Sequence, residues 1–261
     1  MSQFTIPHTS HETCHREDDD LRADEAVQEA LARCDYLVSR RRPLGLVTGQ
    51  PGVGRGRLLD MLLERLDEDM GCLIARFDAT DLSRERLELE LIHTLGLAGR
   101  PGSGTDRSIE LRDRIEGLAE CGRAVVVLID HLDEANADTL QGLRVLLRTT
   151  AARPALTIIG TARPSIVDGL RQLASEFGFV RIELRNLTGD ELVEHARDRL
   201  TRRGEATIAL PSESEAALRE ITGGLPRDVE RLCELLALAR SIDDTNAITP
   251  ERLRAAHAEL I

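Results

Sequence analysis

The stretch Leu46-Val-Thr-Gly-Gln-Pro-Gly-Val-Gly-Arg-Gly-Arg57 lies between an apolar segment and a run of leucines at helical spacing. It follows the pattern G-x-x-x-x-G-K-[ST], with Gly49 and Gly54 at the two glycine positions. Glycines after a strand turn backbone N–H groups toward an anion, and a helix that follows directs its positive end at the same place. The sequence therefore predicts a strand, a phosphate-binding loop and a helix.

Two side chains of this pattern are replaced, because Arg55 stands for lysine and Gly56 for serine or threonine. All 34 basic residues of the chain are arginines, so Arg55 alone is weak evidence against catalysis. Gly56 matters more, since it removes a hydroxyl that would bind Mg²⁺. The loop residues expected to hold a nucleotide are Gly49, Gln50, Pro51, Gly52, Val53, Gly54, Arg55, Gly56 and Arg57.

Composition limits the classes of function. The 261 residues allow one large or two modest domains, and 41% hydrophobic residues are enough for a core. The absence of Trp and an aromatic content of 2% disfavour base stacking, and a net charge of −12 opposes nonspecific binding to nucleic acid. Five scattered cysteines without a C-x-x-C pair, and no apolar run of membrane length, lead us to expect a soluble cytoplasmic protein.

Apolar segments alternate with helical patterns over the first two thirds of the chain. The expected strands cover 44–47, 72–77, 124–129, 155–159 and 179–184. The segment Ala124-Val-Val-Val-Leu-Ile129 is typical of a central parallel strand that is buried on both faces. This alternation predicts a three-layer, doubly wound α/β fold with a parallel five-stranded sheet.

The chain is expected to divide into three parts. Residues 1–20 form a polar tail, 21–187 the α/β core, and 188–261 a small all-helical lid domain. Helix starts are expected at Thr188 and Ser212, which begin capping boxes, and at Thr249. Within the core, a glycine-rich loop over 96–105 is expected to precede a helix over 108–119.

The expected tail contains four candidate zinc ligands. His8, His11, Cys14 and His15 lie within eight residues of one another. Ligands packed so closely rarely complete a tetrahedral site without a second segment, so an unstructured tail is favoured over a metal site.

Taken together, the motifs resemble those of the AAA+ ATPases, and most closely the ExeA-type group, to which TniB-type transposition ATPases are related. Besides the loop, the resemblance rests on the strand ending in Asp130, on Gly160-Thr-Ala-Arg163, on Val180-Arg-Ile-Glu-Leu-Arg-Asn-Leu-Thr188 and on Gly223-Gly-Leu-Pro-Arg227. The resemblance implies that ATP or ADP binds between core and lid, and that neighbouring copies complete each site in a ring or helical assembly.

The resemblance also implies roles for residues at the end of the third strand. Asp130 occupies the position of the aspartate that holds Mg²⁺. The next position usually carries the glutamate that polarises the attacking water, but here it is His131. In a variant that resembles signalling NTPases of the STAND class, Asp133 or Glu134 would serve instead. Both acids are equally compatible with an ordinary loop and helix start.

Three further positions match the family. Thr161 falls at the polar position that contacts a γ-phosphate, with Arg163 as a second candidate, and Arg227 matches the arginine of the lid. The arginine that relatives supply to a neighbouring subunit is absent from its usual position, where Ser175-Glu-Phe-Gly-Phe179 stands. Arg171 or Arg181 are possible substitutes.

Three classes of function follow. The first is a nucleotide-dependent oligomeric switch or scaffold that acts on a protein partner, with weak or absent hydrolysis. The second is an active ExeA-like motor, and the third is a TniB-like regulator associated with DNA. Because Gly56, His131 and the absent arginine each affect a separate part of phosphoryl transfer, the first class is favoured.

Overall fold

A computed structural model describes residues 25–69, 71–97, 104–151, 154–165, 168–202, 211–240 and 248–259. The elements are α2 (Glu25–Ser39), β1 (Leu44–Thr48), α3 (Arg55–Asp69), β2 (Leu73–Asp78), α4 (Arg84–Thr94), α5 (Gly104–Glu120), β3 (Val125–Asp130), the 3-10 helix η1 (Leu132–Glu134), α6 (Ala137–Thr150), β4 (Leu156–Ala162), α7 (Asp168–Phe177), β5 (Val180–Glu183), α8 (Gly189–Arg202), α9 (Ser212–Thr222), α10 (Pro226–Arg240) and α11 (Pro250–Ala258). The cluster of His8, His11, Cys14 and His15 lies outside the described residues.

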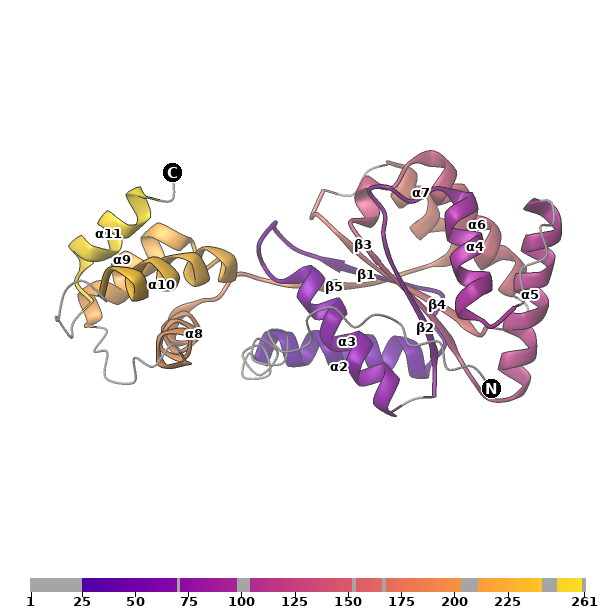
Figure 1. The fold of residues 1–261 in the computed structure, drawn as a ribbon, viewed down its shortest axis with the longest axis horizontal. Coiled ribbons are helices and arrows are strands. Elements are labelled where there is room, and N and C mark those ends of the chain that lie inside the picture. The colour runs from indigo at the N-terminus through magenta and orange to yellow at the C-terminus, as the bar shows by residue number, and fades with distance from the viewer. Residues whose placement is uncertain are drawn as a thin grey trace, which may run out of the picture. The chain divides into compact units, whose positions relative to one another are not determined.

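The five strands form one parallel sheet in the order β2-β3-β4-β1-β5. Figure 1 labels these strands between two groups of helices. Its central strands are buried on both faces, because apolar side chains of β1, β3 and β4 alternate between two helical layers. Helices α4, α5, α6 and α7 pack on one face, and α2 and α3 cover the other. The predicted three-layer, doubly wound fold with a parallel five-stranded sheet is confirmed.

Parallel pairing places the carboxyl ends of the strands at one edge of the sheet. Asp78 of β2 lies opposite Asp130 of β3, and Thr48 of β1 lies opposite Ala162 of β4. Ligands of open α/β sheets bind outside this edge, near the point where the strand order reverses. The fold therefore brings the ends of β2, β3 and β4 next to the loop that follows β1.

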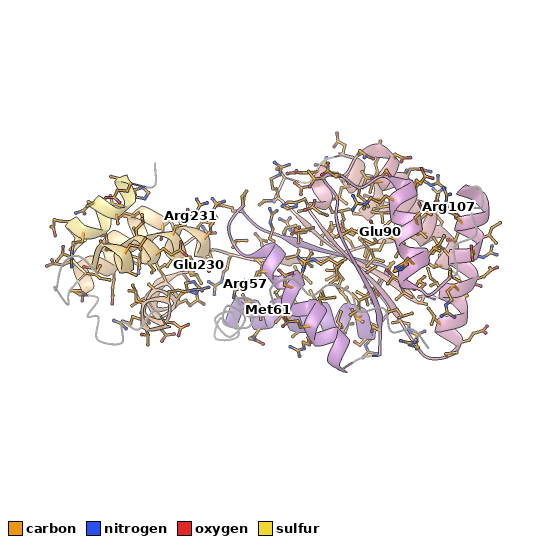
Figure 2. All side chains as sticks on the ribbon, in the orientation of Figure 1. Arg57, Met61, Glu90, Arg107, Glu230 and Arg231 are labelled. Carbon is orange, nitrogen blue, oxygen red and sulfur yellow. The ribbon has the colours of Figure 1, made fainter. Side chains whose placement is uncertain are left out.

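A buried charge joins α4 to α5. The side chain of Glu88 is 3% exposed and accepts bonds from Arg84 Nε at 2.9 Å, Ser108 Oγ at 3.2 Å and Arg107 Nε at 3.4 Å. Arg107, labelled in Figure 2, also reaches Glu85 at 3.4 Å. These contacts fix the first turn of α5, which begins at Gly104 rather than after the loop that was predicted through residue 105.

Residues Glu29–Arg185 form one compact unit, and Asn186–Ile261 belong to a second. In the second unit the described residues 186–202, 211–240 and 248–259 contain helices and no strand. Thr249 caps α11 by accepting a hydrogen bond from Arg252 N, as predicted. Helix α9 begins at Ser212, but the capping box predicted there is wrong, because Pro211 is the capping residue and its carbonyl accepts from Ser214 N and Glu215 N.

The Gly223-Gly224 turn, between α9 and α10, packs against the segment that enters α8. Gly223 and Gly224 both have positive φ, at 55° and 74°. A Cβ at Gly224 would lie 2.1 Å from the carbonyl oxygen of Leu187. Leu187 N donates to the Gly224 carbonyl at 2.8 Å, and Asn186 Nδ2 donates to Gly223 O at 3.0 Å. Only glycine allows this approach, so the turn holds the segment that enters α8.

Candidate nucleotide site

The loop between β1 and α3 has the backbone geometry of an anion cradle. Gly52 and Gly54 have φ angles of 93° and 100°, which side-chain-bearing residues rarely adopt. A Cβ at Gly49 would lie 2.7 Å from Val53 Cγ1 and 2.9 Å from the Leu184 carbonyl oxygen, so the first glycine is required by packing. Since the first N–H groups of α3 have no acceptor within the helix, they are available to an anion.

Arg55 is the first residue of α3 and carries a buried donor. Its Nη1 is shielded from solvent and has no hydrogen-bond partner within the described part of the chain. A buried guanidinium nitrogen without an acceptor costs free energy unless an anion binds there. Arg57 lies one position further along than Gly56 and is partly buried on α3, where Figure 2 labels it.

Gly56 lies against Asp130. A Cβ at this position would be 2.6 Å from Asp130 Oδ2, so the carboxylate occupies the space where a serine or threonine side chain would begin. On the other side, Arg76 Nη2 donates to the Gly56 carbonyl at 3.5 Å and Arg76 also pairs with Asp60. The sequence did not single out Arg76. The structure brings together the two positions that the sequence assigned to metal binding.

Asp130 is held in place by its neighbours on β3 and β4. Its Oδ1 accepts hydrogen bonds from the hydroxyl of Thr161 and from His131 N, the latter at 3.0 Å. Thr161 is fully buried, and its Oγ1 also lies 2.9 Å from His131 N. Thr161 therefore orients the carboxylate, and Oδ2 is the oxygen that faces Gly56.

His131 follows Asp130 in a left-handed backbone conformation, with φ at 51°. Its Nδ1 lies 3.1 Å from Asp78 Oδ2, at the end of the neighbouring strand. Asp78 was missed by the sequence analysis, although its position at a strand end next to Asp130 was a usable signal. Hydrogen bonds from the Thr80 side chain and backbone, together with one from His131, lower the pKa of Asp78.

Asp133 and Glu134 lie in η1 and are paired with Arg163. Arg163 Nε is 2.6 Å from Asp133 Oδ2, and its Nη2 is 3.4 Å from Glu134 Oε1. The Asp133 side chain is 1% exposed, and its hydrogen bond to Arg163 raises the pKa of the guanidinium. The structure thus joins three residues that the sequence placed in separate catalytic and binding roles.

The other arginines that the sequence analysis named also contact neighbouring side chains. Arg181 Nε donates to Thr48 Oγ1 at 3.1 Å, and Arg171 pairs with Asp168 at 2.9 Å on α7. Arg227, in the first turn of α10, is about half exposed and lies 3.5 Å from Asp228 Oδ1.

The fold and the loop define a P-loop α/β protein with a helical unit after its sheet. The chain matches the AAA ATPase domain family over residues 23–159 and belongs to that family.

Solved structures share this fold at low sequence identity. They include the Aeropyrum pernix ORC1 protein in complex with DNA, with a TM-score of 0.63, 15% identity, and coverage of 93% of this chain and 69% of that one. The Thermotoga maritima RuvB Holliday junction branch migration motor matches with a TM-score of 0.59, 16% identity, and coverage of 91% and 70%. The structure of Drosophila ORC bound to DNA matches with a TM-score of 0.63 and 14% identity, and the match covers 100% of this chain and 70% of that one. The search of curated proteins gave no match.

The AAA+ fold implies Mg²⁺ beside the nucleotide, and the residues present do not fit it well. Gly56 offers no hydroxyl, and Asp130 Oδ1 is engaged by Thr161 and His131 N. Among the described residues, no three His, Cys, Asp or Glu side chains gather closely enough to hold a metal ion. Mg²⁺ usually keeps several waters and binds through one or two carboxylates plus substrate phosphates, so the misfit among the described residues lies in the hydroxyl that Gly56 does not supply.

None of the described helices has the length and apolar character needed to span a membrane.

Proposed function

We propose that this chain is an AAA+ protein of the ExeA-like, TniB-related group that binds ATP or ADP and hydrolyses ATP slowly or not at all. In this proposal it acts in the cytoplasm as a nucleotide-dependent oligomeric switch or scaffold on a protein partner. Residues 49–57 hold the phosphates, and Thr161, Arg163 and Arg227 respond to them. Residues 188–261 act as a lid.

One observation carries the proposal. The phosphate cradle keeps its backbone geometry, with Gly52 and Gly54 at positive φ and a buried Arg55 nitrogen that finds no acceptor among the described residues. The neighbouring position that should supply a metal ligand is Gly56, which lies against Asp130. A cradle that keeps its anion-binding backbone while losing a catalytic group favours binding over turnover.

The test is a comparison of binding with turnover in the same preparation. We expect ADP and ATP to bind in calorimetry and to change the mass measured by light scattering. Turnover of ATP should stay well below about 1 per second, and a faster rate would defeat the proposal. Failure of both nucleotides to bind would remove its basis.

The active motor is the second candidate, and the Asp78–His131 pair favours it. With Asp78 accepting from Nδ1, the other imidazole nitrogen is left to accept a proton from water. A role of Asp133 or Glu134 as the base would instead require release from Arg163. Turnover that is fast in the parent chain and lost in His131→Ala, with ADP affinity unchanged, would establish this candidate.

The TniB-like role with DNA is the third candidate. Its support is the likeness in fold to ORC structures solved with DNA, and the net charge of −12 opposes it. Fluorescence anisotropy with a labelled DNA duplex, at several salt concentrations and with each nucleotide, discriminates this role from the proposed role on a protein partner. We expect the chain not to bind the duplex. An affinity for the duplex that falls steeply with salt would favour the TniB-like role.

A further inference from the structure

We propose that this chain binds its nucleotide without Mg²⁺, with Arg55 supplying the positive charge to the phosphates, and that Asp130 makes the site select a diphosphate over a triphosphate. The inference rests on the proposed nucleotide binding and specifies the ligand of that same site. It comes from two neighbouring features, the contact between Gly56 and Asp130 and the buried Arg55 nitrogen.

The protein lacks one of the usual metal ligands. Gly56 carries no hydroxyl, and because Asp130 Oδ2 lies 2.6 Å from the point where a Cβ of residue 56 would be, a serine or threonine would not fit there without a shift of Asp130. Thr161 and His131 N hold the other carboxylate oxygen and keep the carboxylate in this position. An ion bound only to the phosphates would gain little from the protein.

The positive charge needed by the phosphates comes from a side chain instead. Arg55 is the first residue of α3, at the position from which the usual lysine reaches the phosphates. Its buried Nη1 has no acceptor within the described residues, so an incoming phosphate oxygen would satisfy it. A guanidinium presents two donors to a phosphate and keeps its charge at all relevant pH values.

Asp130 then discriminates between nucleotides. In P-loop proteins the metal lies between this carboxylate and the β- and γ-phosphates and neutralises both. Without the metal, the Asp130 carboxylate faces the terminal phosphate of ATP directly, and like charges at short range repel. ADP lacks that phosphate, so the unneutralised carboxylate affects it less.

Calorimetry on the full chain tests the first half, with ADP and ATP each measured in excess Mg²⁺ and in EDTA. We expect the dissociation constant for ADP to differ by less than about threefold between the two conditions. In EDTA, ATP should bind at least about tenfold more weakly than ADP. ADP binding that is tight only with Mg²⁺ would overturn the inference and leave the proposed function standing. Absence of binding in every condition would instead refute the proposed function.

The substitution Asp130→Asn tests the second half, because the two kinds of site predict opposite signs. The amide oxygen can still accept from Thr161 and His131 N, so the local structure is kept. In EDTA the variant should bind ATP at least about threefold more tightly than the parent does, because the repulsion is removed. In a metal site the same change would weaken binding of ATP with Mg²⁺, and that result would refute the inference.

Asp168→Asn is the matched control for net charge, since this side chain is 88% exposed and pairs with Arg171 on the surface of α7. It should leave all four affinities within about twofold of the parent. Thermal unfolding of both variants shows whether each is folded. An equal gain in ATP affinity from Asp168→Asn would assign the effect to overall charge and defeat the role of Asp130.

Discussion

The loop after β1 and the carboxyl ends of β3 and β4 lie side by side, yet they depart from the AAA+ pattern to different degrees. The loop keeps the glycines and the helix start on which anion binding depends. At the strand ends, Asp130 and Thr161 are in place, but Gly56 and His131 change the chemistry around them. Binding of phosphate rests on backbone shape, whereas hydrolysis rests on individual side chains, so the two properties can be separated.

The largest effect should come from Gly49→Ala, which tests the loop. The new methyl group would lie 2.7 Å from Val53 Cγ1 and 2.9 Å from the Leu184 carbonyl. We expect the free energy of unfolding to fall by about 1–3 kcal/mol, as overpacking does, and ADP binding to be lost. Urea unfolding and calorimetry measure the two effects.

Gly117→Ala is the control, because a Cβ at this position in α5 has no heavy atom within 4 Å. It should raise the free energy of unfolding by about 0.5–1 kcal/mol and leave ADP binding unchanged. If both alanine variants behave alike, the steric account of Gly49 is wrong.

Arg55→Ala should be next in size. Hydrogen bonds to charged groups contribute about 1.5–3 kcal/mol, so ADP affinity should fall by about 10- to 150-fold with or without Mg²⁺. Arg55→Lys keeps the charge with a different reach, and its loss should be smaller. Calorimetry with ADP compares the three proteins, and an unchanged affinity in Arg55→Ala would exclude this residue from the site.

Thr161→Val should affect stability more than binding and so sharpen the contrast between the two regions. It removes the hydroxyl that donates to Asp130 and accepts from His131 N. We expect the free energy of unfolding to fall by about 1–2 kcal/mol. ADP affinity should stay within about threefold, since ADP lacks the γ-phosphate. Thr149→Val, which removes a bond within α6, should change stability by less than about 0.5 kcal/mol. A large loss of ADP affinity in Thr161→Val would contradict this assignment.

The smallest effect should come from Asp78→Asn. The folded state lowers the pKa of Asp78, so the ionised carboxylate stabilises the fold. This stabilisation is fully present at pH values above the ordinary aspartate pKa of about 3.9, and it is lost as the pH falls through the lowered pKa. Since the side chain is 57% exposed, the difference at pH 7 should be only about 0.3 kcal/mol. Urea unfolding at pH 7 and near pH 3 should show the difference shrinking at the lower pH. A difference that is constant with pH would show that ionisation is not its cause.

Much of the fold was predictable because it depends on local signals. The β-branched run at 124–129 and the glycines at 49–54 indicated a central strand and its neighbouring loop. The capping box at Ser212 failed because Pro211 offered its carbonyl one residue earlier. Local preferences compete over one or two positions, and tertiary contacts decide between them.

The site was predictable residue by residue, but its pairings were not. Asp130 and Thr161 were named from the resemblance to the AAA+ family, yet their hydrogen bond depends on the register of β3 and β4. The Asp78–His131 and Asp133–Arg163 pairs join residues that are 53 and 30 positions apart. No local pattern specifies such distances in space.

The sequence by itself determined the order of strands and helices along the chain, the glycine-rich loop after β1 and the loss of a hydroxyl at Gly56. These follow from glycine conformations, hydrophobic periodicity and side-chain identity, which act over a few residues. Only the tertiary structure decided that Asp130 fills the space beside Gly56 and that Asp78 engages His131. The physical reason is that the parallel sheet aligns strand ends from distant parts of the chain, and their side chains then choose partners by distance and charge.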